Sequence, residues 1–169
     1  MISSATTLPE ILVVLRLFWR RQGIAGLPIP LLSVREIAAV HGLVLPPDFE
    51  QLYSTVNGMP QIYPSDMDEN GFSVLPVEAL HPQQQDFLVI HDQKARHEQM
   101  AVTVFVDYLQ GCWWYGFAAD ASGETYRIGI MPAKGVFKVL TTSLAEFLQW
   151  YVEDADALYH SDYTFETLL

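Results

Sequence analysis

The stretch LPPDFEQLYSTVNG, residues 45–58, predicts a short helix with its own start and stop signals. Pro46 and Pro47 suit a helix start, because proline presets φ and the first amides of a helix have no intrahelical partner. Asn57-Gly58 is predicted to end the helix, because glycine accepts the left-handed conformation of a C-terminal cap. Between these signals, apolar residues recur at helical spacing on one face, which must meet a core: Phe49, Leu52, Tyr53 and Val56.

Three further helices are expected around this stretch, each opened by a Ser or Thr followed three residues later by Glu. The first ends near Gly23, and its apolar surface is wider than one stripe. That width favours packing on its own domain, although it also suits contact with another chain. The three capping boxes are Thr7 with Glu10, Ser33 with Glu36, and Ser143 with Glu146.

Between the helix of residues 45–58 and the helix that begins near Ser143, apolar runs alternate with turn signals and predict strands. The expected strands are 72–77, 87–90, 101–109, 112–118, 124–130 and 136–140, with 91–98 as a polar loop. A turn at Gln110-Gly111 would set Tyr108 opposite Trp113 and Val106 opposite Tyr115. Together the pattern predicts an α+β domain, with N-terminal helices and a C-terminal helix packed on one side of a mostly antiparallel β-meander.

Composition fits one compact domain of 169 residues with a charge of −11. The expected division is an N-terminal helix and linker over 1–30, packed on a domain over 31–158, followed by an acidic tail over 159–169. Residues 1–44 hold two acidic against four basic side chains, so the negative charge lies in the rest of the chain. Such a field disfavours direct binding of nucleic acid and favours a basic protein partner.

Cys112 is the only cysteine, which fits a reducing, cytoplasmic setting, and we expect it to pack in a strand rather than to act as a nucleophile. The apolar run 11–19 contains Arg16 and fits neither a signal peptide nor a membrane span. No motif for catalysis or for a cofactor is recognised. Half of a calcium loop is present at Asp66, Asp68 and Asn70, but Val77 stands where the bidentate Glu belongs, so a solvated acidic loop is favoured over a metal site.

The start and stop signals of residues 45–58 resemble the opening signature of the SUKH superfamily, which groups bacterial toxin-immunity proteins with fungal regulators of cell-wall synthesis. Residues 115–120 and 123–128 are similar to a later signature, in which a strand ends in Asp, turns at Gly and returns through an aromatic residue. The resemblance covers about residues 33–155. The first helix lies outside it, and the segment 82–99 is longer than in compact members.

The resemblance implies a non-catalytic protein-binding module, and an immunity protein that neutralises a cognate bacterial toxin, for example a nuclease, is the leading hypothesis. A regulatory scaffold for an endogenous protein is the alternative, and a small carboxylate- or metal-dependent hydrolase is a weaker one. Both a monomer and a homodimer fit the sequence. Acidic loops, helix starts and aromatic anchors supply the candidate contacts: Asp48, Glu50, Tyr63, Asp66, Asp68, Glu69, Trp114, Asp120 and Glu124, with Trp113 and Tyr115 as further aromatic candidates.

Overall fold

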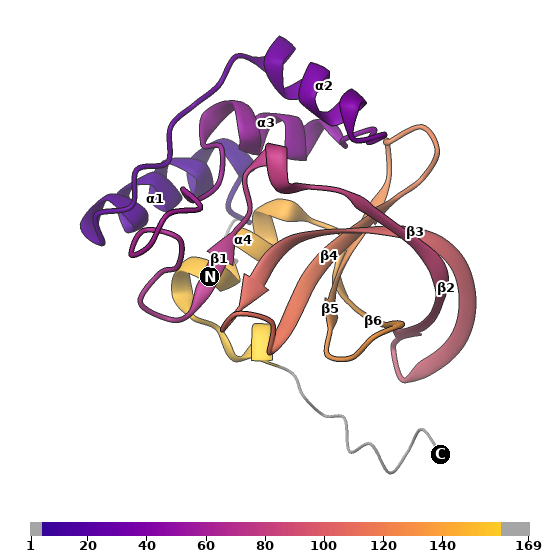
Figure 1. Ribbon diagram of the computed structural model, residues 1–169. Coiled ribbons are helices and arrows are strands. Elements are labelled where there is room, and N and C mark those ends of the chain that lie inside the picture. The colour runs from indigo at the N-terminus through magenta and orange to yellow at the C-terminus, as the bar shows by residue number, and fades with distance from the viewer. Residues whose placement is uncertain (1–4, 160–169) are drawn as a thin grey trace.

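The computed structural model describes residues 5–159 and combines four helices with one six-stranded, strongly curled sheet (Figure 1). The α+β class predicted from the sequence is confirmed. Residues 160–169, most of the expected acidic tail, lie outside the described residues. The helices are α1 (Leu8–Arg21), α2 (Leu31–Val40), α3 (Pro47–Thr55) and α4 (Leu144–Glu153), with short 3₁₀ turns at η1 (Val77–Ala79) and η2 (Asp156–Tyr159). The strands are β1 (Phe72–Val74), β2 (Pro82–His91), β3 (Lys94–Tyr108), β4 (Trp113–Ala119), β5 (Tyr126–Met131) and β6 (Val136–Thr141).

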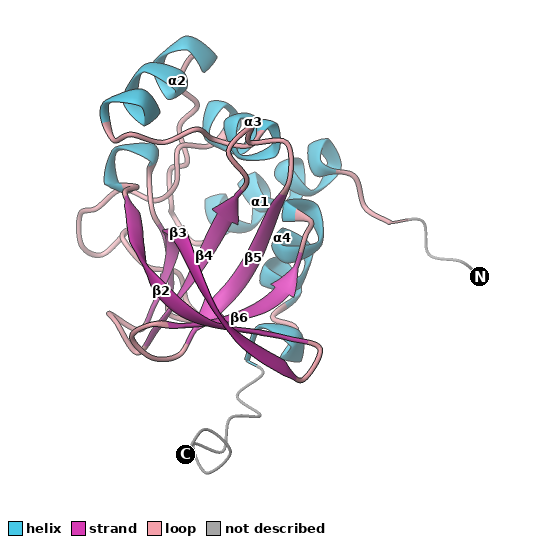
Figure 2. Cartoon of the chain, turned by 90° about the vertical axis from the view of Figure 1, so that its right-hand side faces the viewer, coloured by secondary structure: helices cyan, strands magenta, loops and turns pink. Residues whose placement is uncertain are grey.

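The sheet closes on itself, a feature that the predicted mostly antiparallel meander did not specify. Its order is β1-β3-β2-β6-β5-β4, and β3 also pairs with β4, so β2 to β6 form a ring (Figure 2). The long strand β3 makes this possible because its first part pairs with β2 and its last part with β4. A register shift between Val104 and Val106 bends the strand at the transition. All pairings are antiparallel except that of β2 with β6.

Closure of the ring creates two separate apolar cores. The larger one joins α1, α3 and α4 to the helix-facing side of the sheet and contains Trp19, Phe49 and Phe147. The smaller one fills the ring and contains Phe87, Val102, Met131 and Phe137, among others. Gly129 is required by this packing, since a Cβ there would lie 2.7 Å from the Phe137 ring and 2.5 Å from the Lys138 carbonyl oxygen.

The helix α3 ends two residues before the predicted Asn-Gly stop. Thr55 is its last residue, and Val56 is already extended. Asn57 instead ties segments together, because its Oδ1 accepts the Val77 amide at 2.9 Å and its Nδ2 donates to the Glu78 carboxylate. Gly58 has φ +65°, and a Cβ there would lie 2.6 Å from backbone atoms of Leu75 and Pro76. The Asn-Gly pair is therefore needed because the backbone at Gly58 passes close to the backbone at Leu75 and Pro76.

Of the three predicted capping boxes, that of α1 is confirmed and that of α2 is wrong. At α4 only the N-cap bond is confirmed, because the Glu146 carboxylate accepts the Thr141 hydroxyl instead of the Ser143 amide. Thr7 and Glu10 cap α1 reciprocally, and the Ser143 hydroxyl accepts the Glu146 amide at the start of α4. The helix α2 begins earlier than predicted, at Leu31 with Pro30 as its N-terminal flank, so Ser33 lies inside the first turn. The proline was the stronger start signal, because it presets φ at the entrance of a helix.

The expected polar loop over 91–98 is also wrong, because these residues belong to a regular hairpin. Strands β2 and β3 pair from Pro82 opposite Thr103 to His91 opposite Lys94. Asp92 and Gln93 make the turn, both with positive φ, as the tight turns of hairpins require. Every residue from 91 to 97 is exposed, so the alternation that marks a half-buried strand is missing. The other predicted register, Tyr108 opposite Trp113 and Val106 opposite Tyr115, is confirmed.

Candidate functional site

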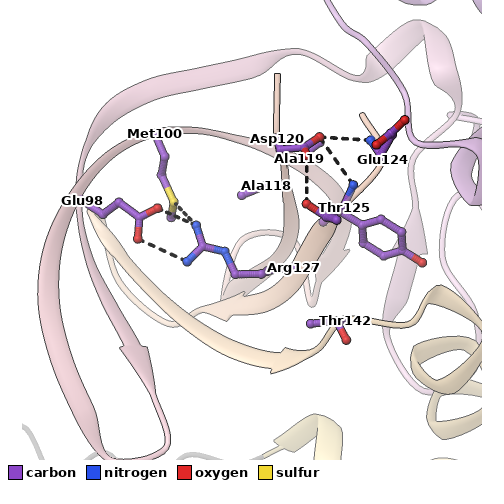
Figure 3. Close-up of a pocket in the computed structure, with 10 residues that line it drawn as sticks. Glu98, Met100, Ala118, Ala119, Asp120, Glu124, Thr125, Arg127 and Thr142 are labelled. Carbon is purple, nitrogen blue, oxygen red and sulfur yellow. Dashed lines mark hydrogen bonds and ion pairs between the residues drawn. The ribbon is translucent and has the colours of Figure 1, made fainter. Parts of the chain in front are cut away.

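A hollow of about 640 Å³ opens beside the turn between β4 and β5 (Figure 3). It borders the core inside the ring, since Met100 and Ala118 belong to both. Polar side chains from four parts of the chain line the rest of it: Glu98 from β3, Asp120, Glu124 and Thr125 from the turn, Arg127 from β5, and Thr142 ahead of α4. We call this feature the acidic hollow.

An ion pair crosses the acidic hollow from β3 to β5. The Arg127 guanidinium donates to both carboxylate oxygens of Glu98, at 2.7 and 3.2 Å, and to the Met100 sulfur at 3.3 Å. Ala118 stands opposite Arg127 in the register of β4, and its small side chain leaves room for the long arginine. Hydrogen bonding to Arg127 lowers the pKa of Glu98 below its usual value. Arg96 also contacts the Glu98 carboxylate, at 3.3 Å, so two guanidinium groups hold this one carboxylate in place.

Asp120 anchors the turn that forms the rim of the hollow. Its Oδ1 accepts the Ser122 hydroxyl at 2.9 Å and the Glu124 amide at 3.0 Å, and its Oδ2 accepts the Thr125 hydroxyl at 3.0 Å. These bonds, that from Ser122 first, lower the pKa of Asp120, so its negative charge persists well below neutral pH. Asp120 and Glu124 are both exposed at the surface. One residue thus shapes the turn and keeps its charge in solvent.

Asp48 joins this rim through Tyr126, which lines the hollow. The Tyr126 hydroxyl donates to Asp48 Oδ2 and accepts the Leu144 amide at 2.9 Å, so the starts of α3 and α4 meet at one phenol. Burial and the Asp48 carboxylate raise the pKa of Tyr126. Three of the nine candidate contacts, Asp48, Asp120 and Glu124, therefore gather at one place. Glu50 lies on the same helix start but pairs with Arg35 of α2 at 2.9 Å.

Asp68 was expected on an acidic surface, and the structure corrects this because its side chain is only 5% exposed. Its Oδ1 accepts the amides of Asn70 and Phe72, both at 2.9 Å, and its Oδ2 accepts the Tyr151 hydroxyl. The lone pairs are thus directed at protein donors and are not presented to a cation or a partner. Burial raises the pKa of Asp68 despite these bonds. Asp68 is therefore no longer a candidate for contact with a partner.

The other acidic and aromatic candidates of the segment before β1 form a second group. They are distant in sequence from the residues that line the acidic hollow. Tyr63 is 86% exposed and Glu69 is exposed. Asp66 lines a smaller hollow of about 230 Å³ together with Asp107 and Gln110. The structure therefore divides the acidic candidates into two groups.

The aromatic candidates are mostly structural. Tyr115 is fully buried and donates to the Leu158 carbonyl oxygen at 2.7 Å, which corrects its candidacy as a contact. Trp113 stacks on Tyr108 with ring centroids 4.2 Å apart. Trp114 is half-buried against the core inside the ring. Cys112, expected to pack within a strand, is instead exposed in the turn before β4.

The sequence did not indicate Glu98 or Arg127 as site residues. Their side chains meet because β3 and β5 lie on the two sides of β4. Within residues 5–159, no group of three or more His, Cys, Asp or Glu side chains is placed to hold a metal ion. No helix in the same range is long and apolar enough to cross a membrane.

In comparisons with known proteins, no family model, curated protein or solved structure matches the chain.

Proposed function

We propose that this chain is a cytoplasmic immunity protein, a non-catalytic module that binds a basic bacterial toxin, for example a nuclease, and neutralises it. The observation that supports the proposal most is the position of Asp120 and Glu124 at the rim of the acidic hollow, with Asp48 bonded to Tyr126 beside them. These carboxylates come from the two segments that carry the resemblance to the SUKH superfamily. A basic cleft that binds phosphate groups is complementary to such a surface.

The hollow has the charge pattern that a basic partner needs. Glu98 is paired with both Arg96 and Arg127, so the negative charge of the hollow lies at its rim, where Asp120 and Glu124 are exposed. The volume of about 640 Å³ lies in the range of pockets that hold a ligand group. An arginine or lysine side chain of the partner would meet Asp120 and Glu124 at the mouth of the hollow. The fixed turn reduces the ordering cost of that contact, because Asp120 already holds its own loop.

Neutralisation in this account is occlusion without chemistry. The immunity protein occupies the basic surface of the toxin, so that nucleic acid no longer has access to it. Long-range attraction between the negative net charge of −11 and the basic toxin raises the association rate. The association rate should therefore fall steeply as ionic strength rises, while dissociation changes less.

The test is charge reversal at the rim, measured against the toxin-like proteins encoded beside this gene. Glu124→Lys should weaken binding at least about tenfold, by loss of one attraction and gain of a repulsion at the rim. Glu69→Lys is the matched control, because it makes the same charge change at an exposed residue of the second acidic group. If Glu69→Lys disrupts binding and Glu124→Lys does not, the acidic hollow is the wrong surface. If no such toxin is bound or neutralised, the proposed function itself is wrong.

A further inference from the structure

The helix α1 carries a second stripe on the side opposite its buried one. The inner stripe, with Leu12, Leu15 and Trp19 among its members, is buried in the main core. The second stripe is exposed and consists of Glu10, Val14, Leu17 and Arg21; we call it the outer stripe. Val14 is 45% exposed and Leu17 is 46% exposed, and the neighbouring Val13 is 59% exposed. Apolar residues of this size are unusual in such a group on a monomer surface.

The spacing of the outer stripe is that of a coiled-coil seam. Its residues are separated by four, three and four positions, which is the alternation of a heptad repeat. The two apolar residues occupy the middle, an acidic residue stands at the N-terminal end, and a basic residue stands at the C-terminal end. A stripe with this order is complementary to a reversed copy of itself. It is not complementary to a parallel copy, which would set Arg21 against Arg21.

We propose that two copies of this chain associate through their outer stripes, with the α1 helices antiparallel around a two-fold axis. The register that sets Val14 opposite the partner's Leu17 also sets Glu10 opposite the partner's Arg21, and the symmetry axis repeats both contacts. The Thr7 cap lowers the pKa of Glu10, so this carboxylate is charged at neutral pH. Antiparallel α1 helices also place their dipoles in opposite directions, which is the favourable arrangement.

A groove beside the stripe enlarges the apolar surface. It lies between α1 and α4, has a volume of about 480 Å³, and is lined by Phe18 and Val152 as well as by Val14 and Leu17. Arg16 and Arg20 are exposed on the same helix, and Arg21 of α1 and Glu153 of α4 border the groove. The three arginines of α1 disfavour the basic toxin as the occupant of this surface. The dimer surface is distinct from the acidic hollow, so dimerisation and toxin binding can be tested independently.

One helix and a shallow groove make a small interface, so we expect a dimer with a dissociation constant in about the micromolar range. Sedimentation of the full chain from about 1 to about 500 µM should show a concentration-dependent dimer. Leu17→Glu should abolish it, because it places two carboxylates in the apolar middle of the seam. A wild-type chain that stays monomeric at every concentration, or a Leu17→Glu variant that dimerises like the wild type, would overturn the proposal.

The register is tested by charge exchange. Glu10→Lys and Arg21→Glu each turn both end contacts into repulsions and should weaken self-association roughly tenfold. An equimolar mixture of the two variants should restore the dimer as a heterodimer in native mass spectrometry. In that heterodimer the introduced lysine meets the introduced glutamate at one end, and the native Glu10 meets the native Arg21 at the other. Glu10→Gln keeps a capping side chain and controls for loss of the helix cap, with helicity checked by circular dichroism. A mixture that associates no better than either variant, or binding of the monomer to vesicles of anionic lipid through this stripe, would contradict the proposal.

Discussion

The substitution Tyr151→Phe should destabilise the protein more than any exposed change, because its hydroxyl joins three elements inside the core. It accepts the Trp19 indole N–H from α1 at 2.9 Å and donates to Asp68 in the segment before β1. Removal of this one oxygen leaves a buried N–H and a buried carboxylate oxygen without a partner. Each such group costs roughly 1–3 kcal/mol, so we expect a loss of about 3 kcal/mol in the free energy of unfolding.

Urea unfolding, with thermal melting as a second measurement, checks this value. For a chain of this size, about 3 kcal/mol corresponds to a decrease of roughly 6–12 °C in Tm. Tyr63→Phe is the control, since it removes the same atom from a residue that is 86% exposed, and it should change stability by less than about 0.5 kcal/mol. A Tyr151→Phe variant within about 1 kcal/mol of the wild type would refute the view that this hydroxyl holds α1 and the segment before β1 to α4.

Three further predictions concern the backbone and the ion pair. Gly58→Ala should cost at least about 3 kcal/mol in urea unfolding, because φ is +65° and the new Cβ would lie 2.6 Å from backbone atoms. Gln93→Gly should raise stability by about 1 kcal/mol in the same assay, because its φ of +64° strains a non-glycine residue; a lower Tm would contradict this. Glu98→Gln should be less stable than the wild type at pH 7, and the two should converge as pH falls through the lowered folded-state pKa of Glu98. Because Arg127 lowers the folded-state pKa of Glu98, the contribution is present above the unfolded pKa of about 4.3 and is lost as pH falls through the folded value.

The helices and the β3–β4 register could be predicted because their signals are local. Helical spacing fixed the buried face of α3, and a turn next to paired aromatic residues fixed Tyr108 opposite Trp113. The Asn-Gly pair shows the limit of that reasoning. Its turn chemistry was recognised, but the demand for glycine comes from a backbone crossing with a distant segment of the chain, at Leu75. Only the folded chain reveals such a close approach.

The candidate site could be predicted only in part, because it depends on contacts between distant parts of the chain. Acidic residues at turns were identifiable, and Asp120 and Glu124 do border one hollow. Whether an acidic side chain faces solvent could not be read from its type, as Asp68 shows by being buried against Tyr151. The ion pair of Glu98 with Arg127 could not be predicted either, because the two residues lie on strands that are not neighbours in the sheet.

The most direct test of the proposed function is co-expression of this chain with each toxin-like protein encoded beside its gene, with cell growth and co-purification as the readouts. We expect that one basic toxin is neutralised, that the two proteins co-purify, and that Glu124→Lys weakens both effects while Glu69→Lys preserves them. If growth is restored by no pairing and no complex forms, the immunity function is contradicted. If Glu124→Lys protects as well as the wild type, the acidic hollow is not the surface that binds the toxin.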